Sequence, residues 1–116
     1  MVPRDPGADG VHREPLTHYV VVRADLPRGI QAANLVHAAG ESSPGDLASG
    51  THAVVLTTRD ELELQRLAAR LEAAGVALVR INEPDAPWDG ALMALGLRPA
   101  RKEDVRRLLS SLPLLR

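Results

Sequence analysis

The chain of 116 residues carries 14 Lys and Arg against 15 Asp and Glu and is therefore nearly neutral. This balance argues against a protein that binds polyanions strongly through a positive charge spread over its whole surface. Its length suits one domain that buries about two thirds of the surface of its unfolded chain. The sequence holds no cysteine, which excludes disulfides and thiolate chemistry. It also has no apolar run of the roughly 20 residues that a membrane helix needs, so we expect a cytoplasmic protein without a membrane segment.

The first residues differ in composition from the rest of the chain. Residues 1–15 are rich in Pro, Gly, Asp and Arg and show no hydrophobic period, which predicts a disordered leader and one domain over 16–116. Helical periodicity predicts helices that begin near Arg28 and Glu61, and a short amphipathic helix over 101–109. Apolar runs predict strands over 18–23, 52–57, 76–81 and 91–97.

The order of these elements predicts an α/β domain with a compact, four-stranded mixed sheet flanked by helices. Strands separated by helices favour right-handed crossovers and a mainly parallel sheet. The third and fourth strands are joined by segment 82–90, which is too short for a crossover helix, so we expect either that those two are antiparallel neighbours or that the loop between them is long. A capping box is predicted at the start of the second helix, because Thr58 and Glu61 stand three residues apart.

The helix after the first strand is the first candidate for a site. One side of it, at positions i, i+3, i+4 and i+7, carries Ile30, Ala33, Asn34 and His37. A second side, predicted to pack on the sheet, carries Ala32, Leu35, Val36 and Ala39. The carboxamide of Asn34 can donate and accept hydrogen bonds, and the imidazole of His37 can do either near neutral pH.

A second candidate segment follows the third strand, where Glu83 and Asp85 flank Pro84. Ligands of open α/β sheets bind at the carboxyl ends of strands. Because parallel strands end at the same edge, we expect Asn34 and His37 to share one concave surface with at least one of the two carboxylates. Such a group could orient a water for hydrolysis. The alternative is that His37 packs in the core and that both carboxylates lie in solvent.

Other polar residues offer weaker signals. Arg23 and Arg28 flank the turn before the first helix and could hold a phosphate at its N-terminus, although exposed arginine without a ligand is common. Trp88, in the loop after the third strand, either stacks on a ligand or covers the core. The histidines show no metal-ligand spacing, so neither a metal nor another cofactor is expected. We interpret Arg101, Lys102, Arg106 and Arg107 as the solvated face of a helix.

One known family has a similar opening. Residues 20–38 have the sequence VVVRADLPRGIQAANLVHA, which resembles the start of the second family of peptidyl-tRNA hydrolases, the small archaeal- and eukaryotic-type enzymes. In that family a strand, Arg-x-Asp-Leu and a glycine precede a helix with Lys-x-Ala-Ala-Gln-x-x-His-Ala. Residues 90–99 look like the family's last strand, so the resemblance spans about 16–99 and implies the same four-stranded mixed sheet.

The resemblance implies a protein that hydrolyses, or at least recognises, the ester between a peptide and tRNA, with peptidyl-tRNA as its partner. The family's lysine and threonine fall on Ile30 and Met93, and its catalytic aspartate falls within Asn82-Glu83-Pro84-Asp85. A bacterial branch of the family, with a Glu-Pro-Asp motif, is similar at these positions. The expected catalytic residues are Asn34, His37, Glu83 and Asp85, and the expected substrate-binding residues are Arg23, Arg28, Gln31 and Trp88.

Two other functions remain open at this point. The first is a binding or interaction module that keeps the fold and the pocket without turnover. The second is a hydrolase of a smaller ester or amide, for which a basic field is unnecessary. Neither the natural substrate nor the oligomeric state, for which a homodimer is one option, follows from the residues.

Overall fold

The computed structural model describes residues 15–116. The predicted leader, residues 1–15, therefore lies outside the described residues except for Pro15. The elements follow in the order β1 (Leu16–Arg23), α1 (Arg28–Ser42), β2 (His52–Thr58), α2 (Glu61–Ala73), β3 (Leu78–Glu83), β4 (Ala91–Leu97), β5 (Ala100–Arg101) and α3 (Lys102–Leu109). The predicted strands and helices are thus confirmed with bounds that shift by up to two residues, and the short β5 is an addition.

The sheet is mixed, as predicted. Its strand order is β2-β1-β4-β3, with β5 paired to the start of β1. β1 and β2 are parallel, while β4 is antiparallel to both β1 and β3, which confirms the expected pairing of the third and fourth strands. β3 therefore runs parallel to β1. The carboxyl ends of β1, β2 and β3 lie at one edge of the sheet, which we call the carboxyl edge.

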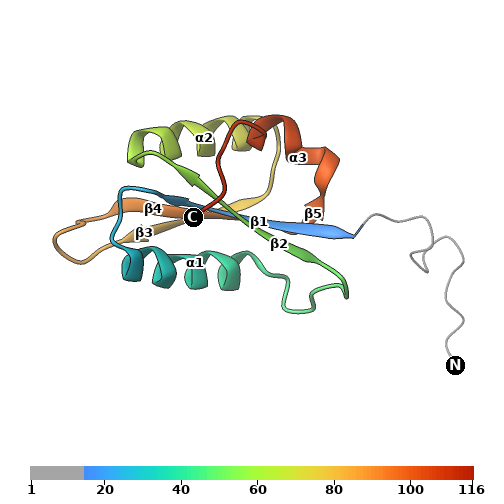
Figure 1. The fold of residues 1–116 in the computed structure, drawn as a ribbon, viewed down its shortest axis with the longest axis horizontal. Coiled ribbons are helices and arrows are strands. Elements are labelled where there is room, and N and C mark those ends of the chain that lie inside the picture. The colour runs from blue at the N-terminus through green and yellow to red at the C-terminus, as the bar shows by residue number, and fades with distance from the viewer. Residues whose placement is uncertain (1–14) are drawn as a thin grey trace, which may run out of the picture.

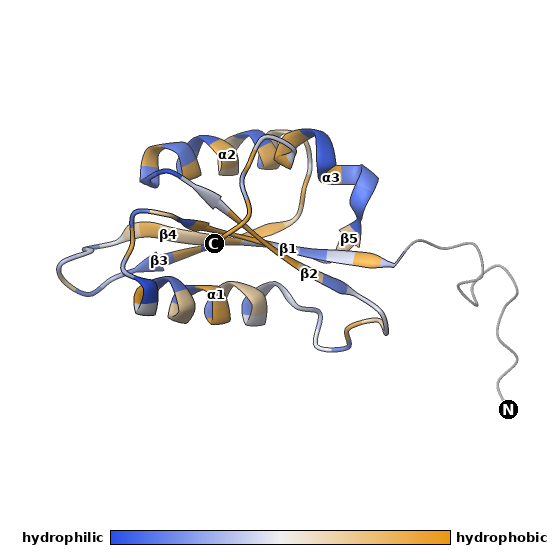
Figure 2. Cartoon of the chain, viewed as in Figure 1, coloured by the Kyte–Doolittle hydropathy of each residue, from blue (hydrophilic) through white to orange (hydrophobic). Residues whose placement is uncertain are grey.

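Two hydrophobic clusters lie on opposite faces of the sheet. Figure 1 shows α1 on one face and α2 with α3 on the other. Alternation along β1 sends Tyr19 and Val21 to the cluster under α2 and α3, and Val20 and Val22 to the cluster under α1. In Figure 2 the middle parts of the strands are hydrophobic, and α3 is hydrophilic at its start and hydrophobic at its end. The core is thus split into two layers by the sheet.

The face of α1 that packs on the sheet differs from the prediction. Val36, expected to face the sheet, is 72% exposed, and Ala32 is exposed as well. The buried residues of α1 are Gln31, Asn34, Ala38 and Ser42. Polar side chains can take this face because they form hydrogen bonds with backbone carbonyls nearby, as Ser42 does when its hydroxyl donates to Ala38 at 2.6 Å.

Close contact between α1 and β4 explains why small residues, Ala38 and Ser42, occupy the buried side of α1 where it meets β4. A Cβ added at Gly96 of β4 would lie 2.2 Å from the carbonyl oxygen of Ala38 and 2.6 Å from Ser42 Oγ. Only glycine leaves room for the helix backbone at this point. The approach seats α1 against the sheet and so fixes where its first turn lies at the carboxyl edge.

The start of α2 also differs from the prediction. Asp60, rather than Thr58, is the N-cap, and its carboxylate accepts a hydrogen bond from the backbone N–H of Glu63 at 2.9 Å. The Glu63 carboxylate accepts from the N–H of Arg59 at 2.6 Å. The hydroxyl of Thr58 donates to the carbonyl oxygen of Asp60 at 3.3 Å instead. The predicted Thr58–Glu61 capping box is therefore wrong, and Glu61 is available for another contact.

The C-terminal segment after α3 returns to the sheet. The N–H of Thr57 donates to the carbonyl oxygen of Pro113 at 2.9 Å, and the N–H of Leu115 donates to Val55 at 3.0 Å. Residues 113–115 thereby cover part of the outer edge of β2. Among residues 15–116, no helix is both long and apolar enough to span a bilayer.

Candidate functional site

The carboxyl edge brings together the two segments that the sequence singles out. β1 ends at Arg23 and leads into α1 at Arg28, while β3 ends at Glu83 and leads through residues 84–90 into β4. Because β1 and β3 are parallel, both segments lie at the same edge. Figure 1 shows the start of α1 and the β3–β4 loop toward the same end of the molecule. The topology on which the predicted site depends is therefore present.

Arg23, the last residue of β1, ties this edge together. Its side chain is buried, and its Nε and Nη2 donate to the two carboxylate oxygens of Asp25, at 2.9 Å each. Its Nη1 donates to the carbonyl oxygen of Leu92 at 3.1 Å. The guanidinium carbon lies 5.9 Å from the centroid of the Trp88 ring, within reach of a cation–π interaction. Arg23 thus joins the β1–α1 turn, the start of β4 and the β3–β4 loop.

The Arg23–Asp25 pair shifts both groups toward their charged forms. The hydrogen bond from Arg23 lowers the pKa of Asp25, and the same hydrogen bond raises the pKa of Arg23. The sequence suggests Arg23 as a phosphate contact, but all three of its side-chain nitrogens donate hydrogen bonds within the protein. Arg28 is exposed at the first residue of α1 and is the better placed of the two arginines for an anion.

Gln31 fastens the first turn of α1 to the end of β1. Its Nε2 donates to the carbonyl oxygens of Arg23 at 3.1 Å and Ala24 at 3.4 Å. Its Oε1 is buried and accepts no hydrogen bond within the described part of the chain. A buried amide oxygen without a donor costs about 1–3 kcal/mol. A donor from water or from a ligand that reached this oxygen would therefore be favoured.

Asn34 and His37 have different surroundings although both lie on α1. Asn34 is buried, and its Nδ2 donates to the carbonyl oxygen of Ile30, one turn earlier, at 2.9 Å. His37 is exposed and lies about 10 Å further along the helix axis than Ile30. The alternative in which His37 packs in the core is thus wrong. Its imidazole is open to a ligand, whereas the Asn34 amide lies on the buried side of α1 with its Nδ2 bonded within the helix.

The acidic loop is shaped by its own backbone. The Glu83 carboxylate accepts from the N–H of Asp85 at 3.3 Å, and the Asp85 carbonyl oxygen accepts from the N–H of Trp88 at 2.9 Å. Glu83 is half-buried and Asp85 is exposed. Across residues 15–116, no hydrogen bond or ion pair joins either carboxylate to His37. Their shared role in one catalytic surface stays a prediction.

Trp88 and Ile30 give this edge an apolar part. Both are partly buried and pack against the hydrophobic cluster under α1 that includes Leu26 and Met93. Trp88 therefore covers the core, which is one of its two predicted roles, while one face of its ring is near Arg23. Stacking of Trp88 on a ligand stays a prediction.

Glu61 belongs to this edge and was missed as a site residue. Its Oε2 accepts a hydrogen bond from the backbone N–H of Leu92 at 2.8 Å, and its charge helps to hold the pKa of Arg23 high. The signal available in the sequence is an acidic residue at the start of the helix that follows β2, a strand that ends at the same edge. Only the pairing of β1 with β4 reveals that Leu92 is its partner.

Comparison with known proteins gives the family. The model of the peptidyl-tRNA hydrolase PTH2 family matches residues 16–115. A solved structure of a protein of unknown function from Agrobacterium tumefaciens strain C58 covers 89% of this chain and 99% of that chain, with a TM-score of 0.56 and 16% sequence identity, a likeness of the fold alone. No curated protein matches the chain. Because the family model spans every element from β1 to α3, the chain belongs to the peptidyl-tRNA hydrolase PTH2 family.

Proposed function

We propose that this protein recognises peptidyl-tRNA and hydrolyses the ester that joins the peptide to the tRNA. The observation that carries the proposal is the family match over residues 16–115. The carboxyl edge supports it, because a cation and a carboxylate are both exposed there, at Arg28 in the first turn of α1 and Asp85 in the β3–β4 loop. Ester hydrolysis needs a positioned water and stabilisation of developing charge, which such groups can supply.

Each polar group of the edge has a proposed role. Asp85 orients the attacking water, because its exposed carboxylate is not held by a hydrogen bond within the described residues, and Glu83 supports the loop beneath it. His37 and Asn34 orient the ester, the first from the exposed side of α1 and the second from its buried side. Arg28 meets a tRNA phosphate at the start of α1, where free backbone N–H groups also favour an anion.

Two apolar residues favour slow turnover. Ile30 and Met93 stand where the family's lysine and threonine fall, and neither side chain can donate a proton or carry a charge. Met93 is fully buried, with its Sδ 3.9 Å from Nη1 of Arg23. These positions also favour a second candidate function, a module that binds peptidyl-tRNA without cleaving it.

The direct test is release of a labelled, N-blocked amino acid from aminoacyl-tRNA by the full-length protein. We expect release faster than in buffer alone. His37→Ala and Asp85→Asn should each reduce the rate at least tenfold and leave the melting temperature unchanged, because both side chains are exposed. The matched controls His52→Ala and Asp89→Asn, also exposed, should keep the full rate.

Three results would change this assignment. Release at the buffer rate, with tRNA retained by the protein at low salt, would replace the hydrolase by the binding module. Release at the buffer rate without retention of tRNA would contradict both candidates. Cleavage that survives both His37→Ala and Asp85→Asn would move the reaction away from the proposed residues.

A further inference from the structure

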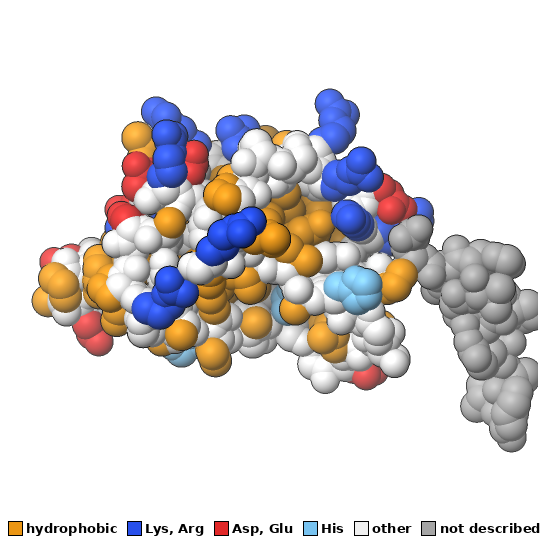
Figure 3. Space-filling view, viewed as in Figure 1, with side chains coloured by type: hydrophobic (Ala, Val, Ile, Leu, Met, Phe, Trp, Pro, Cys, Tyr) orange, Lys and Arg blue, Asp and Glu red, His pale blue; other side chains and the backbone are white. Residues whose placement is uncertain are grey.

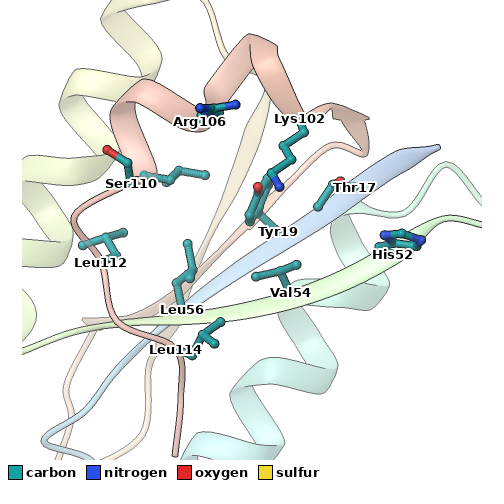
Figure 4. Close-up of a pocket in the computed structure, with 11 residues that line it drawn as sticks. Thr17, Tyr19, His52, Val54, Leu56, Lys102, Arg106, Ser110, Leu112 and Leu114 are labelled. Atoms are coloured by element: carbon teal, nitrogen blue, oxygen red, sulfur yellow. The ribbon is translucent and has the colours of Figure 1, made fainter. Parts of the chain in front are cut away.

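A concave surface lies beneath α3, on the face of the sheet opposite α1. It is a cavity of about 540 Å³, a volume typical of small-molecule sites. Thr17 and His52, neighbours across the amino ends of β1 and β2, line one end of it, and Leu112 and Leu114 line the other (Figure 4). We call this cavity the α3 pocket. None of its lining residues belongs to the carboxyl-edge site described above.

The floor of the α3 pocket is apolar and within reach of solvent. Leu114 is 54% exposed, and Val54 and Leu112 are only partly buried. Figure 3 shows hydrophobic side chains exposed on this face of the molecule. Apolar surface in a concavity favours an occupant with a hydrocarbon part. The floor consists of Tyr19, Val54, Leu56, Leu109, Leu112 and Leu114.

Two cations stand over this floor. Lys102 and Arg106 are one turn apart on α3 and both line the pocket. Figure 4 shows the Lys102 side chain reaching toward Tyr19, with Arg106 on the helix above. Of the acidic residues of α3, Glu103 forms its ion pair with Arg101, although its charge also attracts Arg106, and Asp104 lines a different cavity. Among residues 15–116, neither Lys102 nor Arg106 forms an ion pair.

We propose that the α3 pocket binds a small anion with a hydrocarbon chain, an alkyl carboxylate of medium length. The carboxylate lies at Lys102 and Arg106, where two cations without ion pairs favour a negative charge. The chain lies on the aliphatic floor and ends near Leu114. Local sequence pattern does not distinguish these cations from a solvated helix face, because the strands that form the floor are distant in the chain.

An extended peptide suits this surface less well than a simple alkyl chain. A peptide needs partners for its own N–H and C=O groups, and a free strand edge is the usual source. From Val55 to Thr57 the outer edge of β2 is already occupied, because Thr57 N–H donates to Pro113 and Leu115 N–H donates to Val55. A hydrocarbon chain has no such requirement.

The test is calorimetric titration of the full-length protein with decanoate, below its micelle-forming concentration. We expect saturable binding of one decanoate per chain. The double variant K102Q/R106Q should bind at least tenfold more weakly. L114S should weaken binding at least threefold, and its exposed position leaves the fold intact. The control double variant R98Q/R107Q removes the same charge outside the pocket and should bind decanoate as the unmodified protein does.

Several outcomes would overturn the proposal. Equal binding of 1-decanol and decanoate would mean that the cations play no part. Equal binding of acetate and decanoate would mean that the chain plays none. Equal weakening in the two double variants would reveal a diffuse charge effect rather than a site, and absence of saturable decanoate binding would remove the site altogether.

Discussion

His18 of β1 is a buried histidine that connects the strand to the last turn of α1. Its Nε2 lies 2.7 Å from Ser42 Oγ. The Ser42 hydroxyl uses its own proton to donate to the carbonyl oxygen of Ala38. The hydrogen bond between the two side chains is therefore donated by the Nε2–H of His18 and accepted by Ser42 Oγ. Burial lowers the pKa of His18 below its usual value. The neutral ring is therefore the form that suits the folded protein.

This histidine predicts a loss of stability in mild acid. Because its pKa is lower in the folded than in the unfolded chain, the unfolded chain takes up the proton first, and the free energy of unfolding falls as the pH drops below about 6.5. Chemical denaturation between pH 7 and 5 measures the slope. His18→Gln should flatten it, whereas the exposed His52→Gln should retain it. An equal slope in both variants would contradict this account.

The Arg23–Asp25 pair predicts a stability effect at the carboxyl edge. Asp25→Asn removes the charge that faces a buried guanidinium, and we expect the free energy of unfolding at pH 7 to fall by about 1–2 kcal/mol. Because the pKa of Asp25 is lowered, this contribution is present above the usual carboxyl pKa and is lost as the pH falls through its folded value.

Urea denaturation measures the Asp25→Asn effect. Asp85→Asn is the matched control, because its exposed carboxylate forms no side-chain hydrogen bond within residues 15–116, and it should change stability by less than about 0.5 kcal/mol. Similar losses in the two variants would mean that the pair does not brace the edge.

At the scale of elements, the approach of α1 to β4 is the contact that positions the site. Gly96→Ala would place a methyl group against the Ala38 backbone, and we expect a loss of about 3 kcal/mol in the free energy of unfolding. Gly40→Ala, on the same helix with open space around it, should instead gain about 0.5–1 kcal/mol from helix propensity. Equal thermal melting of both variants would contradict the close packing.

The same contact explains where prediction from sequence fails in α1. The periodicity predicts the helix and correctly packs Leu35 against the cluster under α1, but it also assigns Val36 to the sheet-facing side on hydropathy. The observed side carries Asn34 and Ala38 because Gly96 brings the helix backbone close to β4, and polar atoms can be satisfied within the helix. Such a contact depends on a strand that lies some 60 residues away in the chain, so local pattern cannot reveal it.

At the scale of the whole molecule, the fold separates the carboxyl edge from the α3 pocket. The mixed sheet and the antiparallel pairing of β3 with β4 follow from the sequence, and so does the position of the start of α1 and of the acidic loop at one edge, whereas the strand order β2-β1-β4-β3 does not. The partners of Arg23 and Glu61 and the return of residues 113–115 to β2 depend on tertiary contacts that no local spacing encodes. The α3 pocket depends on the same contacts, because the C-terminal segment forms part of its wall.

The central claim is that peptidyl-tRNA reacts at the carboxyl edge, beside the first turn of α1. The most direct test is to restore the family's lysine with Ile30→Lys and to measure release from N-blocked aminoacyl-tRNA. Ile30 is half-buried at the helix start, so a lysine stem can pack there while its ammonium reaches solvent. We predict a rate at least tenfold above that of the unmodified protein, through stabilisation of the developing negative charge. An unchanged rate in a folded Ile30→Lys variant would contradict the claim.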